Sequence, residues 1–200
     1  RHFFDEDALK YSNPHVAEGN CSVSWAIATV KAAEVALKKS GLDVKLSWSY
    51  LNTCLPKLMM NEDDDPCKGM SSRTIIRFLE QYGIPSEEDW TADMECDNQD
   101  VLYKFAAYET EGPNKAYLMK LIAESDPVVV LMAIDLNKIK FVRDMRANKQ
   151  DVIRCADSQP TLWGRVFSYK DSEGSMEGYW EVETNVVPSE NMFIRIPLTS

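Results

Sequence analysis

The sequence predicts an α+β fold in which helices occupy the first half of the chain and strands occupy the second. A first helix is expected over 24–40, because helix formers dominate there and Gly41 follows Lys38-Lys39-Ser40 as a stop signal. After Pro127 the pattern changes to short apolar segments between turn residues, which is typical of strands. The 200 residues, of which 44% are hydrophobic, are enough for one ordinary domain or for two small lobes that share an interface.

The remaining elements follow from apolar spacing and breaker residues. The first helix carries apolar residues on several faces, which indicates that it is buried. Two more helices are expected, one ended by Gly83 and Pro85 and one stopped before Pro127. We expect helices at 71–82 and 115–125, and strands at 128–134, 162–169, 179–183 and 192–196.

Charge limits the partners that this chain can bind. The net charge is -10, from 32 acidic and 22 basic residues, so nucleic acid and anionic membrane surfaces should repel it. No apolar stretch approaches the roughly 20 residues that cross a bilayer, and the first five residues contain no signal-peptide core. The acidic run at 62–65 lacks the spacing of a calcium loop and is interpreted as a solvated loop.

Cysteine usage leaves two compartments open. The five cysteines form no Cys-x-x-Cys pair and are accompanied by only two histidines, so we expect no metal site and no cofactor. All five could be buried thiols in a cytosolic protein, or two disulfides and one odd thiol could mark an oxidising compartment. They are Cys21, Cys54, Cys67, Cys96 and Cys155.

Several segments, in order along nearly the whole chain, are similar to one known family. Residues 19–26 read Gly-Asn-Cys-Ser-Val-Ser-Trp-Ala, which resembles the Gln-Gly-x-Cys-Gly-x-Cys-Trp-Ala segment of papain-like cysteine peptidases. Residues 190–196, Glu-Asn-Met-Phe-Ile-Arg-Ile, resemble the terminal Glu-Asn-Gly-Tyr-Ile-Arg-Ile of that family. Further similarities lie at Asp5, Pro14, Leu46-Ser47 with Leu51 and Cys54, 67–70, 81–84, 87–90 and 127–130.

This resemblance implies a single papain-like domain over 1–200 with two lobes and a cleft between them. The helical lobe would cover roughly 15–105, and an antiparallel β-barrel lobe would cover roughly 106–200 together with the N-terminal strand. The resemblance also implies the disulfides Cys21–Cys67 and Cys54–Cys96, with Cys155 as a free thiol. Such bonds would place the protein outside the cell, in the secretory pathway or in a lysosome-like vacuole.

The nucleophile and base positions of the family are altered here. The family reaction needs a cysteine thiolate activated by a histidine, and Ser24 stands at the nucleophile position. No histidine follows His15 in this sequence, so the proton acceptor that a serine needs is missing. Counting back from Ser168-Tyr169, which is similar to a Gly-Tyr of the family, the histidine position falls on Leu162.

The supporting positions differ as well. Glu18 replaces the glutamine that stabilises the oxyanion, and its carboxylate would repel that negative charge. The orienting asparagine becomes Thr184, or Asn185 if the register shifts by one residue. Met70 replaces a glycine that follows Gly69, and its side chain is expected to crowd the cleft. An engineered Cys→Ser change would explain Ser24 alone and none of these other departures.

These observations predict a pseudopeptidase rather than a working protease. We expect it to act by binding a protein or a peptide, as a decoy or regulator of active proteases, because a fold retained without its chemistry suggests use of its surface. The cleft candidates are Glu18, Ser24, Gly69, Met70 and Leu162. Two alternatives remain: a structural, storage or antigenic protein without a cleft ligand, and a weak hydrolase that depends on Ser24.

Overall fold

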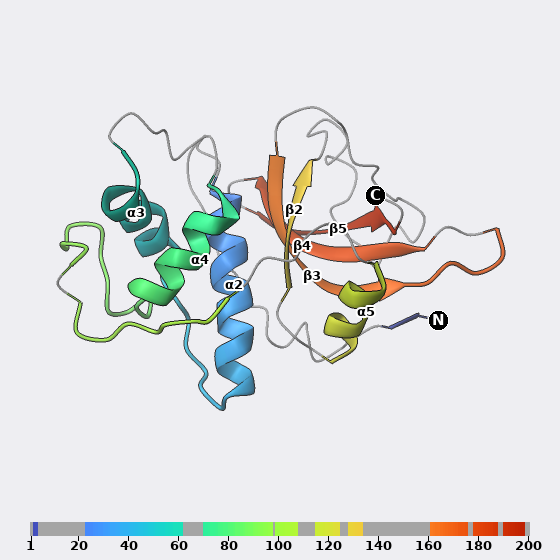
Figure 1. The fold of residues 1–200 in the computed structure, drawn as a ribbon, viewed down its shortest axis with the longest axis horizontal. Helices are drawn as coiled ribbons and strands as arrows, with labels where there is room; N and C mark the ends of the chain where they lie inside the picture. The colour runs from blue at the N-terminus through green and yellow to red at the C-terminus, as the bar shows by residue number, and fades with distance from the viewer. Residues whose placement is uncertain are drawn as a thin grey trace.

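A computed structural model describes residues 2–3, 23–61, 70–97, 99–107, 115–124, 128–133, 161–175, 178–187 and 190–198 (Figure 1). Its elements, in chain order, are β1 (His2–Phe3), α2 (Ser24–Lys39), α3 (Trp48–Met59), α4 (Ser72–Gln81), α5 (Lys115–Ala123), β2 (Val128–Ala133), β3 (Thr161–Lys170), β4 (Tyr179–Val187) and β5 (Glu190–Pro197). Helices therefore dominate the first half and strands the second, as the sequence predicts, and the α+β class is confirmed.

The strands form one antiparallel sheet of five strands, in the order β1-β3-β4-β5, with β2 also paired to β3. The strands β1 and β2 share one edge of β3, because β2 pairs with its first part and Phe3 of β1 pairs with Tyr169 near its end. The N-terminal strand thus joins the sheet, as the family resemblance implies. Closure of this sheet into a barrel stays a prediction.

Helix α2 stands between the sheet and helices α3 and α4, as Figure 1 shows. It contacts α3 on one side and β3, β4 and β2 on the other. Thirteen of its 16 residues are buried, which explains why its apolar residues cover several faces. The helix ends where the sequence predicts, with Lys38 and Lys39 in the last turn and Gly41 at a φ of 85°.

Capping serines begin the two other helices of this part of the chain. The Ser47 hydroxyl accepts a hydrogen bond from the Tyr50 N–H at the start of α3. Ser71 does the same for Thr74 at the start of α4. Helix α4 stops two residues before Gly83, whose φ of 85° favours glycine. A Cβ at this position would lie 2.5 Å from the Tyr103 carbonyl oxygen, so the close approach also requires glycine.

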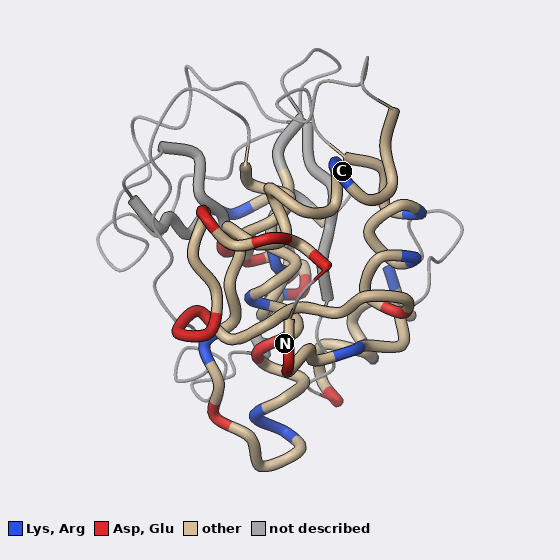
Figure 2. The backbone as a smooth tube through the Cα atoms, turned by 90° about the vertical axis from the view of Figure 1, so that its left-hand side faces the viewer, with Lys and Arg blue, Asp and Glu red and all other residues tan. Residues whose placement is uncertain are grey.

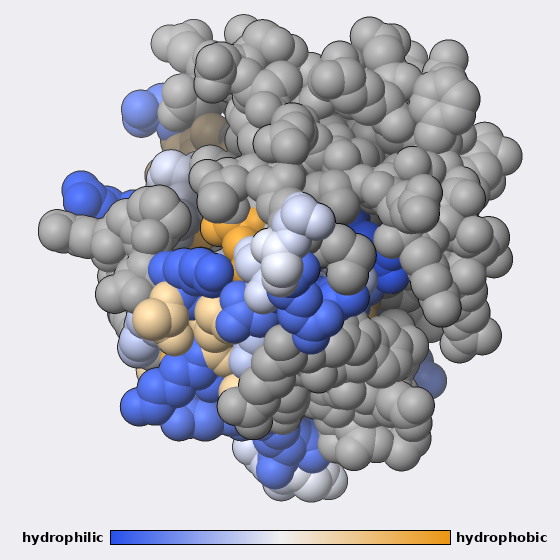
Figure 3. Space-filling view, turned by 90° about the vertical axis from the view of Figure 1, so that its right-hand side faces the viewer, coloured by the Kyte–Doolittle hydropathy of each residue, from blue (hydrophilic) through white to orange (hydrophobic). Residues whose placement is uncertain are grey.

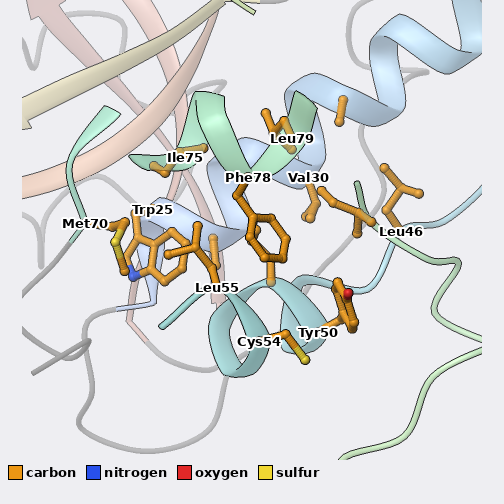
Figure 4. Packing of buried hydrophobic residues seen from close by; sticks show 14 of the residues in the cluster. Trp25, Val30, Leu46, Tyr50, Cys54, Leu55, Met70, Ile75, Phe78 and Leu79 are labelled. Atoms are coloured by element: carbon orange, nitrogen blue, oxygen red, sulfur yellow. The ribbon is translucent and has the colours of Figure 1, made fainter. Parts of the chain in front are cut away.

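The main hydrophobic core lies among α2, α3 and α4 (Figure 4). The ring of Tyr50 packs edge-on against Trp90, at 5.5 Å between ring centroids, and lies 6.1 Å from the ring of Phe78. The Tyr50 hydroxyl donates to the Cys96 carbonyl at 3.1 Å, and burial raises the pKa of this phenol. The expected Cys54–Cys96 disulfide is present and ties α3 to the segment after Trp90.

Charged residues of both signs lie along the described backbone of both parts of the molecule (Figure 2). On the face shown in Figure 3, the described residues are mostly hydrophilic and surround a small hydrophobic area. The large apolar side chains that are exposed in the described part are Leu42, Met94 and Val101. None of the described helices is both long enough and apolar enough to span a membrane.

Candidate functional site

Ser24 is the first residue of α2, so its side chain lies at the positive end of the helix dipole. The helix begins on the Val23 carbonyl, which accepts hydrogen bonds from the N–H groups of Ala26 and Ile27. The Ser24 side chain is buried, with 3% of the residue exposed. Its Oγ accepts a hydrogen bond of 3.3 Å from the backbone N–H of Trp163 on β3. The hydroxyl therefore joins the helical part of the molecule to the sheet.

This hydrogen bond brings Leu162 next to Ser24 in space, although 138 residues separate them in the sequence (162 minus 24). Leu162 immediately precedes Trp163 on β3, and its backbone is paired with Met132 of β2. The two positions that the family resemblance assigns to nucleophile and base are thus neighbours. Among the described residues, the partner of the Ser24 hydroxyl is a hydrogen-bond donor, the backbone N–H of Trp163. A serine that acts as a nucleophile needs a proton acceptor instead.

Thr184, the position assigned to the orienting asparagine, lies on β4, next to β3 in the sheet. It directly follows Glu183, whose partner across the strands is Arg165. Because β3 and β4 are antiparallel, Leu162 and Thr184 lie towards the same end of this strand pair. The structure describes the backbone at both positions.

Met70 is buried, with 8% of the residue exposed, and belongs to the main core. Figure 4 shows its side chain beside the indole ring of Trp25, the residue that follows Ser24. The indole Nε1 of Trp25 has no hydrogen-bond partner among the described residues. The polarizable thioether of Met70 packs beside this ring. Whether Met70 also narrows the cleft stays a prediction.

The other predicted site residues lie outside the described residues. They are Glu18, Gly69, Cys155 and the proposed pair Cys21–Cys67. Within the described ranges, no group of three or more His, Cys, Asp or Glu side chains is arranged to hold a metal ion.

Sequence reasoning missed a group of buried charges where α2 meets the sheet. The Lys31 Nζ of α2 lies 3.0 Å from the Glu183 Oε1 of β4, and both side chains are almost fully buried. The Arg165 Nε of β3 lies 3.8 Å from the same carboxylate oxygen. We call Lys31, Arg165 and Glu183 the seam ion cluster. Burial lowers the pKa of Lys31, and the nearby Glu183 carboxylate partly opposes that shift.

A sequence signal for this cluster existed in α2. Lys31 and Glu34 are the charged residues among the buried residues of α2, and an all-round buried helix has no solvent face for them. The Glu34 carboxylate accepts a hydrogen bond of 3.0 Å from the Leu46 N–H, so it too has a partner in the interior. The strand charges gave no such signal, because alternating charged and apolar residues normally indicate a strand with one solvated face.

Comparison with known proteins identifies the family of this chain. The family model of papain family cysteine proteases matches residues 4–183. The chain belongs to this family. Two crystal structures of the Amb a 11 cysteine protease, a major ragweed pollen allergen, in its proform, are similar to this papain-family chain. The TM-scores are 0.67 and 0.64, and both structures are 21% identical to the chain in sequence.

These two matches cover 96% and 94% of the present chain but 52% and 58% of the solved chains. The papain-family chain therefore spans a little more than half the length of the structures that it matches, and the likeness establishes a papain-like fold. No curated protein sequence matches it.

Proposed function

We propose that this papain-family chain is a pseudopeptidase that works by binding a protein or a peptide. The observation that carries the proposal is the contact of Ser24 with β3. At the nucleophile position the hydroxyl is buried and accepts an N–H from Trp163, and the residue before Trp163 is a leucine. Among the described residues, the contact of this hydroxyl is with a donor and not with a proton acceptor, and acyl transfer by a serine begins with loss of its proton to such an acceptor.

The absence of a later histidine supports the same proposal. The sequence contains histidine at positions 2 and 15 only, whereas the family base would lie near 162 on β3. Glu18 adds a carboxylate where the reaction would develop negative charge, which raises the energy of that intermediate. The nucleophile, the base and the oxyanion donor are all replaced, which is expected of a chain that no longer needs to catalyse peptide hydrolysis.

Retention of the fold supports a role in binding. The Cys54–Cys96 bond and the packed core among α2, α3 and α4 keep the helical part in shape without the chemistry that this shape normally serves. We propose the whole of 1–200 as one papain-like domain, with the helical lobe over roughly 15–105 and the β-barrel lobe over roughly 106–200 plus the N-terminal strand β1. The cleft candidates are then Glu18, Ser24, Gly69, Met70 and Leu162.

We place the protein outside the cell, in the secretory pathway or in a lysosome-like vacuole. The disulfide between Cys54 and Cys96 supports an oxidising compartment, since such bonds are rare where glutathione keeps thiols reduced. In that setting, active relatives and the proteins that inhibit them supply the natural partners of a decoy.

A competition assay tests the decoy role directly. An active papain-family protease is mixed with an equimolar protein inhibitor of that family, and hydrolysis of a fluorogenic peptide is followed as the present chain is added. The wild type should restore hydrolysis in proportion to its concentration, because it draws the inhibitor away. Ser24→Trp should restore none, provided that its far-UV circular dichroism and its cooperative urea unfolding show that it is folded.

Lys45→Met is the matched control, because Lys45 forms an exposed ion pair with Glu87 in the helical part and is not a cleft candidate. It should restore hydrolysis as the wild type does. Failure of the wild type to restore any hydrolysis would refute the decoy role and favour the structural or storage alternative. Peptide hydrolysis by the wild type alone, abolished in Ser24→Ala, would instead establish the weak hydrolase.

A further inference from the structure

The seam ion cluster links three elements that each carry a degenerate catalytic position. Lys31 follows Ser24 by seven residues, which is about two turns of α2. Arg165 follows Leu162 by three residues on β3, and Glu183 immediately precedes Thr184 on β4. The contact of α2 with β3 and β4, which we call the seam, therefore contains the cluster close to the Ser24–Trp163 hydrogen bond.

Strand register places the strand charges on the face that α2 covers. Glu181 and Glu183 point to the same face of β4, because side chains in a strand alternate. Arg165 opposes Glu183, and a register shift after Val166 lets Ser168 oppose Glu181 on that same face. The 3.0 Å contact of Lys31 with Glu183 identifies this face as the one towards α2.

Among the described residues, the buried charges balance. Lys31, Arg165 and Arg195 carry three positive charges, and Glu34, Glu181 and Glu183 carry three negative ones. Each of these carboxylates has a partner. Glu183 forms an ion pair with Lys31, and Glu34 accepts a hydrogen bond from the Leu46 N–H. Glu181 accepts hydrogen bonds from the Ser168 hydroxyl at 2.6 Å and from the Arg195 Nε at 3.4 Å. Buried charges that lie beside a charge of opposite sign are tolerated in a dry interface, whereas a single charge left without its partner favours hydration.

We infer that Lys31 and Glu183 form an ionic latch that keeps the seam closed over Ser24 and fixes the position of α2 on the sheet. Apolar contacts are non-directional and tolerate sliding, but two buried charges hold their favourable energy only in one alignment. With the latch paired, the seam stays dry and the Trp163 N–H reaches the Ser24 hydroxyl. With Glu183 neutralised, the remaining positive charge of Lys31 draws water in and the seam opens. This device is independent of the proposed binding function and would exist whether or not the cleft has a ligand.

The chemical accessibility of position 24 reports the state of the seam. The parent for the test is Ser24→Cys, alkylated with iodoacetamide at constant pH and quantified by mass spectrometry on the peptide that contains position 24. Burial of this position should make the parent react slowly. Glu183→Gln, which is nearly isosteric and removes only the charge, should raise the labelling rate by about tenfold or more through local opening of the seam.

The double variant Lys31→Met/Glu183→Gln distinguishes a latch from simple loss of stability. It removes one positive and one negative charge together, so the sum of the described buried charges stays unchanged and the labelling rate should return to within about threefold of the parent. Glu183→Asp keeps the charge but shortens the side chain, so it should give an intermediate rate and remain informative if Glu183→Gln does not fold.

Two controls set the comparison. Lys45→Met breaks an exposed ion pair away from the seam and should leave the rate at position 24 unchanged. Leu51→Ala creates a cavity in the core among the helices and lowers the melting temperature without touching the latch. The latch is refuted if Glu183→Gln labels no faster than the parent, if Leu51→Ala at an equal loss of melting temperature labels as fast as Glu183→Gln, or if the double variant stays fast.

Discussion

The backbone N–H of Trp163 donates a hydrogen bond to the hydroxyl of Ser24 across the seam, at 3.3 Å. The donor lies on β3, and the acceptor is the first residue of α2. The two residues are 139 positions apart in the sequence. The contact gives the serine at the nucleophile position a structural role, because its lone pairs satisfy a buried backbone donor.

Ser24→Ala should destabilise the protein by about 1–2 kcal/mol, because the Trp163 N–H loses this acceptor in a buried place. Urea unfolding at equilibrium measures the loss as a lower midpoint with an unchanged slope. Hydrogen exchange of the Trp163 amide should also become faster in the variant than in the wild type.

Ser47→Ala provides the matched control for this change. Ser47 is also a buried serine whose oxygen accepts a backbone N–H, but its donor is Tyr50, three residues away on α3. It should cost about 1 kcal/mol as a lost helix cap, with no effect on the Trp163 amide. An unfolding midpoint for Ser24→Ala equal to that of the wild type would show that the bond across the seam contributes nothing.

The second prediction concerns the two glycines that end helices α2 and α4. Gly41 and Gly83 share a φ of 85°, so alanine at either position adopts an unfavourable left-handed backbone, at about 1 kcal/mol. They differ in their surroundings, because a Cβ at Gly41 meets nothing within 4 Å, whereas a Cβ at Gly83 meets the Tyr103 carbonyl at 2.5 Å.

Gly83→Ala should therefore cost clearly more than Gly41→Ala, by about 1–3 kcal/mol of additional overpacking strain. It should also disturb the paired hydrogen bonds between Ile84 and Tyr103, which hold the segment after α4 in place. Thermal unfolding of the two variants side by side measures the difference. Equal melting temperatures would mean that the backbone near Tyr103 moves away without cost.

The positions of the elements were predictable because local signals mark them. Gly41 and the two lysines before it end α2 where the sequence indicates, and the apolar run after Pro127 forms β2. The proximity of Ser24 to the segment at 162–163 followed only from the family resemblance, since nothing local in either segment refers to the other. The fold class was therefore accessible from sequence, and the two positions that the resemblance assigns to nucleophile and base lie close together in the structure.

The seam ion cluster was not predictable in the same way. An alternating strand such as β4 gives the same pattern whether its charged face meets water or meets other charges, and only tertiary packing decides between the two. The bulge after Val166 adds to the difficulty, because it changes which face the following residues of β3 occupy. Lys31 and Glu34 within a buried helix were the local sign of partners elsewhere in the chain.

The last prediction concerns the alkaline pH dependence of stability. Burial lowers the pKa of Lys31 below its ordinary value of 10.5, and the positive charge of Arg165 lowers it further, while the carboxylates of Glu183 and, more weakly, Glu34 oppose this shift. Between the lowered native pKa and 10.5, the unfolded chain holds a proton on this lysine more often than the native protein does. The free energy of unfolding should therefore gain a contribution from Lys31 that rises with pH across this window.

Tyr50 and Tyr179 act in the opposite direction, since burial raises the pKa of both phenols in the native protein. Native tyrosines then keep their protons longer than unfolded ones, and stability falls as pH rises above 10.0. The difference between the wild type and Lys31→Met/Glu183→Gln removes this common contribution and isolates Lys31. Measured by urea unfolding at several pH values from neutral up to the ordinary lysine pKa, this difference should shift in favour of the wild type as pH rises. A difference that stays constant, or that shifts towards the double variant, would show that Lys31 is as easily protonated in the native protein as in the unfolded chain, and that water already reaches the seam.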